Sequence, residues 1–211
     1  IFIVGDDAQL PPVTKEQLPE RIRLFLESLF SFYRNLHNIT TLQLKSNRRS
    51  NKAIVDVIKM TNKYEDLIAV GNNKDRLVDY DHSQIENPIL KDILDINRVF
   101  CLIQHDKKHD LIYSPLEVKL ACKIIILIIN LYQKQNLIKS AEDVIAYFSK
   151  EIGCIAYHNI QRKKIHTLLK TEIKNLFPNI SDDELNSALS SSVMTVDRFQ
   201  GSERNIMVIT F

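Results

Sequence analysis

Short apolar runs alternate with longer amphipathic segments along most of this chain, and this alternation limits the folds that it can adopt. Apolar residues at helical spacing predict helices over 19–36, from 51 to about 64, over 115–133 and over 159–176. Short apolar runs predict strands at 1–4, 40–44, 97–103, 151–156, 192–196 and 206–211. Strands that alternate with helices form βαβ units. We therefore expect an α/β fold in which helices cover both faces of a parallel sheet.

The remaining segments add little to this architecture. Residues 65–96 are weakly patterned and are expected to form loops and short pieces, whereas 182–189 is expected to be a short amphipathic piece. The most apolar stretch, 121–132, contains Lys123 and is too short to span a bilayer, so we expect a buried helix.

Charge and cysteine content set broad limits on partners and compartment. The net charge of +2 neither requires nor excludes a nucleic-acid partner, so a basic surface would have to be local. The three cysteines include no C-x-x-C pair and show no metal spacing with the histidines. We expect three buried thiols in a reducing, intracellular compartment, with cytoplasm and nucleus not distinguished, and no metal ligands in this chain.

Polar turns follow several of the predicted strands, and these turns are the first place to look for a site. They come after Val4, Leu44, Ile155 and Val196. In open parallel sheets, ligands bind beyond the carboxyl ends of the strands. The residues of these turns are therefore the candidates for ligand contacts.

The first such turn has the sequence GDDAQLPP, from Gly5 to Pro12. The amide of Gln9 offers both a donor and an acceptor, and the two prolines stiffen the segment that follows it. The string resembles motif III of superfamily 1 helicases. The resemblance implies that Gln9 is a catalytic residue that senses the terminal phosphate of ATP and that Asp6 couples the sites. An ordinary strand-to-loop turn is the alternative.

The second string, LQLKSNRRSNK, resembles the stretch of these helicases that contains motif IV. In that alignment Arg49 stands at the position of the motif arginine, and Arg48 stands where an aromatic residue usually packs on the base. The resemblance implies that Arg49 is catalytic and that both arginines bind ATP, because a guanidinium offers a fixed fork of donors to a phosphate. A solvated arginine pair at a helix start is the alternative.

The third string, TVDRFQGSERN followed by an apolar run, resembles motif V of the Upf1-like, or DNA2/NAM7-like, branch of superfamily 1B. The resemblance implies that Thr195 contacts a nucleic-acid phosphate and that Gly201 and Glu203 bind the nucleotide. It also implies that Asp197 and Gln200 couple the two sites. A polar loop between two strands is the alternative.

A fourth string, EIGCIAYHNIQRKK, resembles a further segment of the family but departs from it. Gly153 and Gln161 match, whereas Ala156, Tyr157 and His158 stand where Thr, Pro and Tyr are usual. The resemblance implies nucleic-acid contacts by Tyr157, His158 and Arg162, although a solvated helix face also explains the basic residues. Glu117 matches the family, and Ser114 is expected to cap the following helix.

Taken in order, the four strings imply a RecA-like fold that is incomplete at both ends, with residues 1–38 as the tail of one RecA-like domain and 39–211 as most of the second. The implied function is an ATP-dependent helicase or translocase, moving 5′-to-3′ on single-stranded RNA or DNA. The chain contains no phosphate-binding loop, so we expect it to be inactive alone and the Mg²⁺ ligands to lie upstream.

The resemblance also implies that Gln9, Arg49 and Glu203 meet at one nucleotide cleft. Two alternatives remain: a non-catalytic nucleic-acid-binding or scaffold module with a degenerate helicase fold, and an unrelated α/β nucleotide-binding enzyme.

Overall fold

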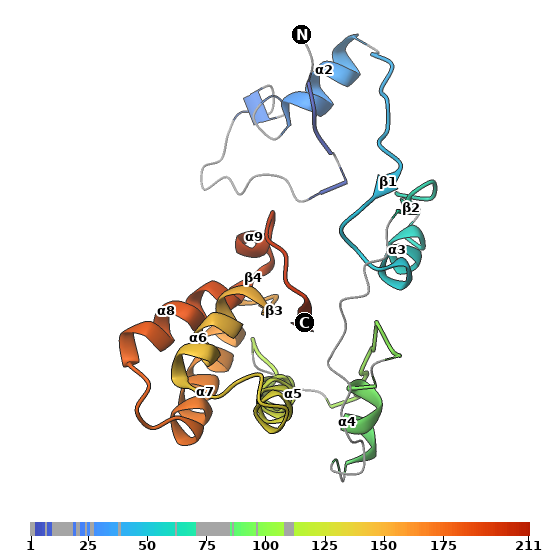
Figure 1. Ribbon diagram of the computed structural model, residues 1–211. Coiled ribbons are helices and arrows are strands. Elements are labelled where there is room, and N and C mark those ends of the chain that lie inside the picture. Colours follow the sequence, from blue (N-terminus) through green and yellow to red (C-terminus); the bar gives the residue numbers. More distant parts are fainter. Residues whose placement is uncertain are drawn as a thin grey trace. The chain divides into compact units, whose positions relative to one another are not determined.

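The computed structural model describes residues 3–6, 8–9, 19, 22–23, 25, 28–37, 39–61, 63–70, 85, 87–95, 97–107 and 112–211. The chain divides into two compact units, Ile1–Lys74 and Asp75–Phe211, which we call the first and second unit. Each unit is described by itself (Figure 1).

The first unit contains four described elements: α2 (Leu29–His37), β1 (Ser46–Asn47), α3 (Lys52–Lys59) and β2 (Ile68–Ala69). The two strands pair in parallel, with Ser46 opposite Ile68 and Asn47 opposite Ala69. Helix α2 confirms the C-terminal part of the helix that the sequence predicts over 19–36. Among the described residues of this unit, Val55 alone is buried.

Helix α3 begins as predicted and ends early. The side chain of Asn51 accepts a hydrogen bond from the Ala53 amide at 3.0 Å, which satisfies one of the open donors of the first turn. The helix stops at Lys59 rather than near residue 64, and the side chains of Ile54 and Val57 are more than a third exposed. The helical spacing of the apolar residues predicts that Ile54 and Val57 face inward, and this prediction is wrong.

Three of the predicted strands are not found among the described residues. No described residue within 1–4, 40–44 or 97–103 belongs to a strand, and Ile1 and Phe2 lie outside the described residues. Val4 is 91% exposed, Leu42 97% and Leu102 71%. A strand needs a neighbour to satisfy its backbone groups, and within the described part of the chain these segments pair with none. In place of the strand predicted at 40–44, the short strand β1 begins two residues later, at Ser46.

The second unit holds most of the regular structure. Its elements are α4 (Pro88–Ile93), α5 (Pro115–Lys134), α6 (Ala141–Lys150), β3 (Ile152–Ala156), α7 (Asn159–Leu176), α8 (Asp182–Ser192), β4 (Val193–Thr195), α9 (Val196–Phe199) and β5 (Ile206–Thr210). The predictions of helices over 115–133 and 159–176 and of strands near 151–156, 192–196 and 206–211 are confirmed. The expected loops of 65–96 contain β2 and α4.

The strands of the second unit form a parallel sheet in the order β4-β3-β5. All five residues of β3 are buried, so both faces of this central strand are covered. Helix α5 packs on α7 and α6 packs on α8, and each pair also contacts the sheet. This mixture of helices and parallel strands is consistent with an α/β RecA-like fold, as the sequence predicts.

Helix α5 forms much of the core. Ser114 caps it by accepting a hydrogen bond from the Glu117 amide at 3.3 Å, and Pro115 occupies the first turn, as predicted. The helical spacing predicts an apolar face made of Val118, Ala121, Cys122, Ile125 and Ile129, and all five are buried. The helix also buries Ile124, Ile128, Leu131 and Tyr132. None of the described helices is both long enough and apolar enough to cross a bilayer.

Helix α6 is an element that the sequence analysis does not predict. Ser140 and Asp143 form a capping box, in which the Ser140 side chain accepts from the Asp143 amide and the Asp143 carboxylate accepts from the Ser140 amide. Val144 and Phe148 are fully buried on its inner face.

The three cysteines differ in environment. Cys122 and Cys154 are buried, whereas Cys101 is exposed, so the expectation of three buried thiols is wrong for Cys101. Burial raises the pKa of Cys122 to about 12 and raises that of Cys154 as well, which keeps both thiols protonated and unreactive near neutral pH.

Candidate functional site

The carboxyl edge of the β4-β3-β5 sheet brings together residues that the sequence places far apart. Ala156 is opposite Thr195 of β4 on one side and opposite Thr210 of β5 on the other. The Tyr157 amide donates to the Thr210 carbonyl at 3.2 Å, and the Thr210 hydroxyl donates to the Ile155 carbonyl at 3.3 Å. Thr195 is the last residue of β4, and Tyr157 directly follows β3. These two predicted nucleic-acid residues therefore lie at the same edge of the sheet.

Two aromatic rings and a cation lie at the turn from β3 to α7. Tyr157 is 64% exposed, and its ring lies perpendicular to that of His158, with centroids 4.9 Å apart. His158 is the N-cap residue of α7 but makes no side-chain capping bond. The Arg162 Nε donates to the Asn159 Oδ1 at 2.8 Å, which orients the guanidinium beside this turn.

Ala156 itself cannot serve as a ligand contact. Its side chain is fully buried, and it has no hydroxyl in the place where the helicase pattern has Thr. The next two residues, Tyr157 and His158, are exposed.

A polar network, buried at Ser114 and Gln161, joins the starts of two helices to Phe211, the residue after β5. The Ser114 amide donates to the Gln161 Oε1 at 2.8 Å, and the Gln161 Nε2 donates to the Glu117 Oε2 at 3.1 Å and to the Phe211 carbonyl at 3.4 Å. Glu117 also accepts from the Phe211 amide at 3.0 Å and lies 3.4 Å from the His105 Nε2. Gln161, which matches the helicase pattern, is only 1% exposed, and its side chain makes its hydrogen bonds inside the protein.

The segment after β4 is a short helix followed by a turn. Asp197 lies exposed in the first turn of α9, and Gln200 follows the helix, its amide donating to the Val196 carbonyl at 3.2 Å. Gly201 adopts φ +86°, a left-handed conformation that favours glycine. A Cβ atom placed on Gly201 would have no neighbour within 4 Å, so the backbone here is open to a ligand.

Arg204 fixes the end of this turn, and the sequence analysis does not assign it a role. Its guanidinium donates to the Glu203 carbonyl at 2.7 Å and to the Ser191 carbonyl at 3.0 Å, and lies 5.8 Å from the centre of the Phe199 ring. These contacts hold the backbone beside Glu203, whose side chain is exposed. In the sequence, the position of Arg204 directly after the predicted ligand residue Glu203 is the one feature that points to it.

In the first unit, the carboxylate of Asp6 accepts hydrogen bonds from Gln9 and from two other residues. The Asp6 Oδ2 accepts from the Gln9 Nε2 and from the Tyr64 hydroxyl, each at 2.8 Å, and the Oδ1 accepts from the Ala8 amide at 3.1 Å. Burial alone would raise the pKa of Asp6, but the hydrogen bonds from Tyr64, Gln9 and Ala8 outweigh it and lower this pKa. The sequence does not reveal the contact of Tyr64 with Asp6, because the two residues are 58 positions apart.

The two arginines of the second string lie on a turn that Asn47 shapes. The Asn47 Oδ1 accepts from the Arg49 amide at 3.0 Å and from the Ser50 amide at 2.8 Å, the pattern of an Asx turn. Arg48 and Arg49 are both exposed. Gln9 and Arg49 belong to the first unit and Glu203 to the second, so their meeting at one nucleotide stays a prediction.

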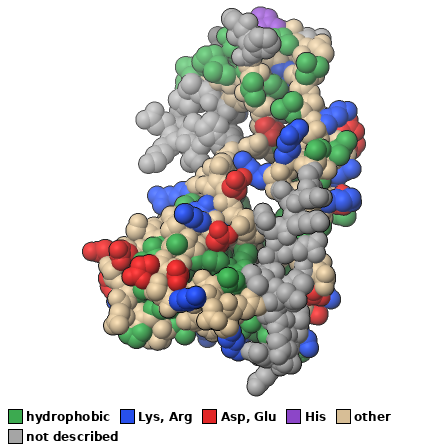
Figure 2. All heavy atoms as spheres, viewed as in Figure 1, with side chains coloured by type: hydrophobic (Ala, Val, Ile, Leu, Met, Phe, Trp, Pro, Cys, Tyr) green, Lys and Arg blue, Asp and Glu red, His purple; other side chains and the backbone are tan. Residues whose placement is uncertain are grey.

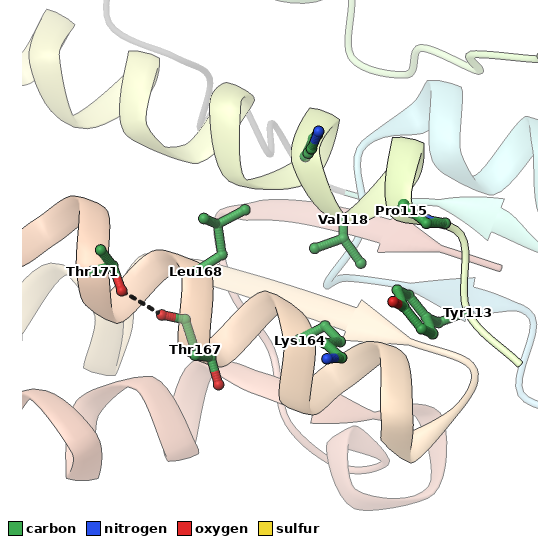
Figure 3. Close-up of a pocket in the computed structure, with 8 residues that line it drawn as sticks. Tyr113, Pro115, Val118, Lys164, Thr167, Leu168 and Thr171 are labelled. Carbon is green, nitrogen blue, oxygen red and sulfur yellow. Dashed lines mark hydrogen bonds between the residues drawn. The ribbon is translucent and has the colours of Figure 1, made fainter. Parts of the chain in front are cut away.

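A shallow pocket of about 330 Å³ lies between α5 and α7 (Figure 3). Pro115, Val118 and Leu168 supply apolar surface, and the Lys164 Nζ lies 5.5 Å from the centre of the Tyr113 ring. None of the residues predicted to bind ATP or nucleic acid lines this pocket.

Charges and possible metal ligands are dispersed. On the face drawn in Figure 2, Lys and Arg side chains are interspersed with Asp and Glu. Within the described part of the chain, no three His, Cys, Asp or Glu side chains lie close enough together to hold a metal ion.

The chain matches a family model over most of its length. A family model described as AAA domain matches residues 25–211. This range includes the second, third and fourth strings and begins after the first. No curated protein matches the chain, and no solved structure does so.

Proposed function

Since this chain belongs to the AAA domain family, a P-loop NTPase type found in Upf1-like helicases, we propose that it is part of an ATP-dependent nucleic-acid helicase or translocase. The observation that carries the proposal is the family match, which covers the parallel sheet of the second unit and the second, third and fourth strings. Two of these strings supply the residues at the carboxyl edge of β3 and β4, where parallel sheets bind their ligands.

The nucleic-acid surface of the proposal is this carboxyl edge. Thr195 and Arg162 supply a hydroxyl and a guanidinium for phosphates, and Tyr157 and His158 supply exposed aromatic surface. The partner is a single strand of RNA or DNA, and movement along it runs 5′-to-3′.

The nucleotide surface of the proposal combines cationic and open positions. Arg48 and Arg49 supply exposed guanidinium donors, and the open backbone of Gly201 admits close approach by a ligand. We assign these residues to the phosphates of ATP, with Gln9 and Glu203 as further contacts. Mg²⁺ neutralises phosphate charge in reactions of this type. The described residues offer no cluster for it, so we assign no magnesium ligand to them.

Domain boundaries and coupling complete the proposal. We assign motifs III to V of superfamily 1B to this chain, with residues 1–38 in the first RecA-like domain and 39–211 in the second. Asp6, Asp197 and Gln200 would transmit movement between the nucleotide and the nucleic acid. The hydrogen bond between Asp6 and Gln9 supports such a role, because it ties the two side chains to each other.

A non-catalytic nucleic-acid-binding or scaffold module is the second candidate. Two departures from the helicase pattern favour it: Arg48 replaces an aromatic residue, and Ala156 is buried without a hydroxyl. A module of this kind would bind single strands without turning over ATP.

ATP turnover by the complete protein separates the two candidates. We expect nucleic acid to stimulate ATP hydrolysis and Arg49→Ala to reduce kcat by roughly 10³-fold to 10⁵-fold, the range for arginine fingers. Lys52→Ala is the matched control, because Lys52 is an exposed cation nearby whose ion pair with Asp56 (2.6 Å) lies on the surface of α3. Unchanged turnover in Arg49→Ala would remove this residue from its role, and binding without any turnover would favour the module.

A further inference from the structure

Tyr157 presents an aromatic ring at a rigid position of the second unit. The preceding residues of β3 are all buried, and Tyr157 is 64% exposed immediately after them. Its amide donates to the Thr210 carbonyl at 3.2 Å, so the ladder of the sheet continues to this residue. The ring is therefore carried by the sheet itself and not by a long loop, which reduces the entropy lost when a ligand binds.

The neighbouring ring leaves room for a planar ligand. Tyr157 and His158 meet edge to face, with their planes at 88° and centroids 4.9 Å apart. Rings in this arrangement do not stack on each other, so stacking surface remains for a flat group. A base of a nucleic acid is such a group, and every base offers a π-face.

The charges around the ring favour a nucleic-acid strand over an uncharged aromatic ligand. Arg162 lies one turn into α7, its amide donating to the His158 carbonyl at 3.0 Å, and its guanidinium is oriented by Asn159. Thr195 lies at the level of Ala156 on the adjacent strand. A cation and a hydroxyl beside an exposed ring match the alternation of phosphates and bases along a single strand.

We propose that Tyr157 is a stacking platform for one base of a single-stranded nucleic acid, with Arg162 at an adjoining phosphate. The inference rests on the proposed function and deepens it. The buried, hydroxyl-free Ala156 supplies no polar contact to the strand, and the exposed ring of the next residue provides a contact of a different kind. The site thereby binds bases of any sequence rather than the backbone alone.

Paired oligonucleotides test the platform in the complete protein. Affinities for a short thymidine strand and for an abasic strand of equal length are measured with wild type, Tyr157→Ala and Tyr157→Phe. We expect Tyr157→Ala to weaken binding of the thymidine strand by roughly 5-fold to 150-fold, as loss of one stack does, and to leave binding of the abasic strand unchanged. Tyr157→Phe keeps the ring and should stay close to wild type.

Phe100→Ala is the matched control, because Phe100 is another exposed aromatic residue of the second unit, at 53% exposure. It should bind both strands as wild type does. Equal losses of Tyr157→Ala on both strands, or equal affinity of wild type for both, would overturn the stacking platform while the proposed function stands. If wild type binds neither strand, the proposed function itself fails, and the platform with it.

Discussion

The two units have the same alternation of apolar and polar segments in their sequences, yet the second unit buries many more of its apolar side chains than the first. The second unit surrounds β3 with helices, so that residues such as Phe148 and Ile152 are fully buried. In the first unit Val55 is the one buried residue among those described, and Leu42 and Leu44 are 97% and 85% exposed. An apolar pattern stabilises a fold only where a packed neighbour removes it from water.

Truncating an apolar side chain in each unit should show this difference most strongly. Phe148→Ala removes a fully buried ring from α6, and we expect it to cost about 3–5 kcal/mol of unfolding free energy. Leu42→Ala changes a side chain that is 97% exposed, so its cost should stay within about 0.5 kcal/mol. Hydrogen exchange resolved along the chain measures both. Equal costs would refute the comparison.

Glutamine substitutions should separate the units by a smaller margin. Gln161→Ala leaves the buried Ser114 amide without its acceptor, which we expect to cost about 1–3 kcal/mol. Gln9→Ala removes an exposed hydrogen bond to Asp6 and should change stability by about 0.5 kcal/mol or less. Urea unfolding followed by circular dichroism gives both values, and a larger loss for Gln9→Ala would contradict the assignment of Gln161 to a buried network.

The glycines of the two units should respond differently to the same replacements. Gly201→Ala forces an L-residue into φ +86°, at a cost of about 1–2 kcal/mol, and Gly201→Asn should recover part of it because asparagine tolerates this conformation. In Gly5→Ala the new Cβ would lie 2.5 Å from the Phe30 Cβ, so Gly5→Asn should be no better than Ala. Thermal unfolding of the four variants measures these costs. Recovery by asparagine at both sites would contradict a steric cause at Gly5.

Acid titration makes the finest distinction. Hydrogen bonds to the carboxylates lower the pKa of both Asp6 and Asp143, so each stabilises its unit above the ordinary pKa of 3.8 and loses that effect as pH falls toward the lower folded value. Tyr64→Phe removes one donor and should raise the pKa of Asp6 while leaving that of Asp143 unchanged. Carboxyl NMR titration measures both, and a shift at Asp143 would show that the effect is not local.

The same contrast explains how far the sequence predicts the fold. Helices α5 and α7 and strands β3–β5 are predicted because their apolar residues have clear helical or strand spacing, and Ser114 adds a cap at the start of α5. Strands at 40–44 and 97–103 are wrongly predicted because an extended segment also needs a partner, which a local pattern does not reveal. Helix α6 was missed although Ser140 and Asp143 have the spacing of a capping box, with Asp in place of the usual Glu or Gln.

The candidate site divides in a similar way. The register of β3 and β4 brings Thr195 and Tyr157 to one edge, as expected from strand ends in a parallel sheet. Tyr64, Arg204 and the network around Gln161 depend on contacts between distant segments or on backbone carbonyls, and neither is visible in a residue string. Residue type and spacing therefore predict where polar turns gather, whereas the supporting contacts come only from the fold.

The central claim of the proposal is that Arg49 of the first unit and Glu203 of the second act on one nucleotide. A double-mutant cycle on kcat/KM for ATP in the complete protein tests it, using Arg49→Ala, Glu203→Gln and the double variant. We predict a coupling free energy of about 0.5–3 kcal/mol, as for residues that share a ligand. Effects that add within about 0.3 kcal/mol would contradict the claim, because independent sites behave in that way.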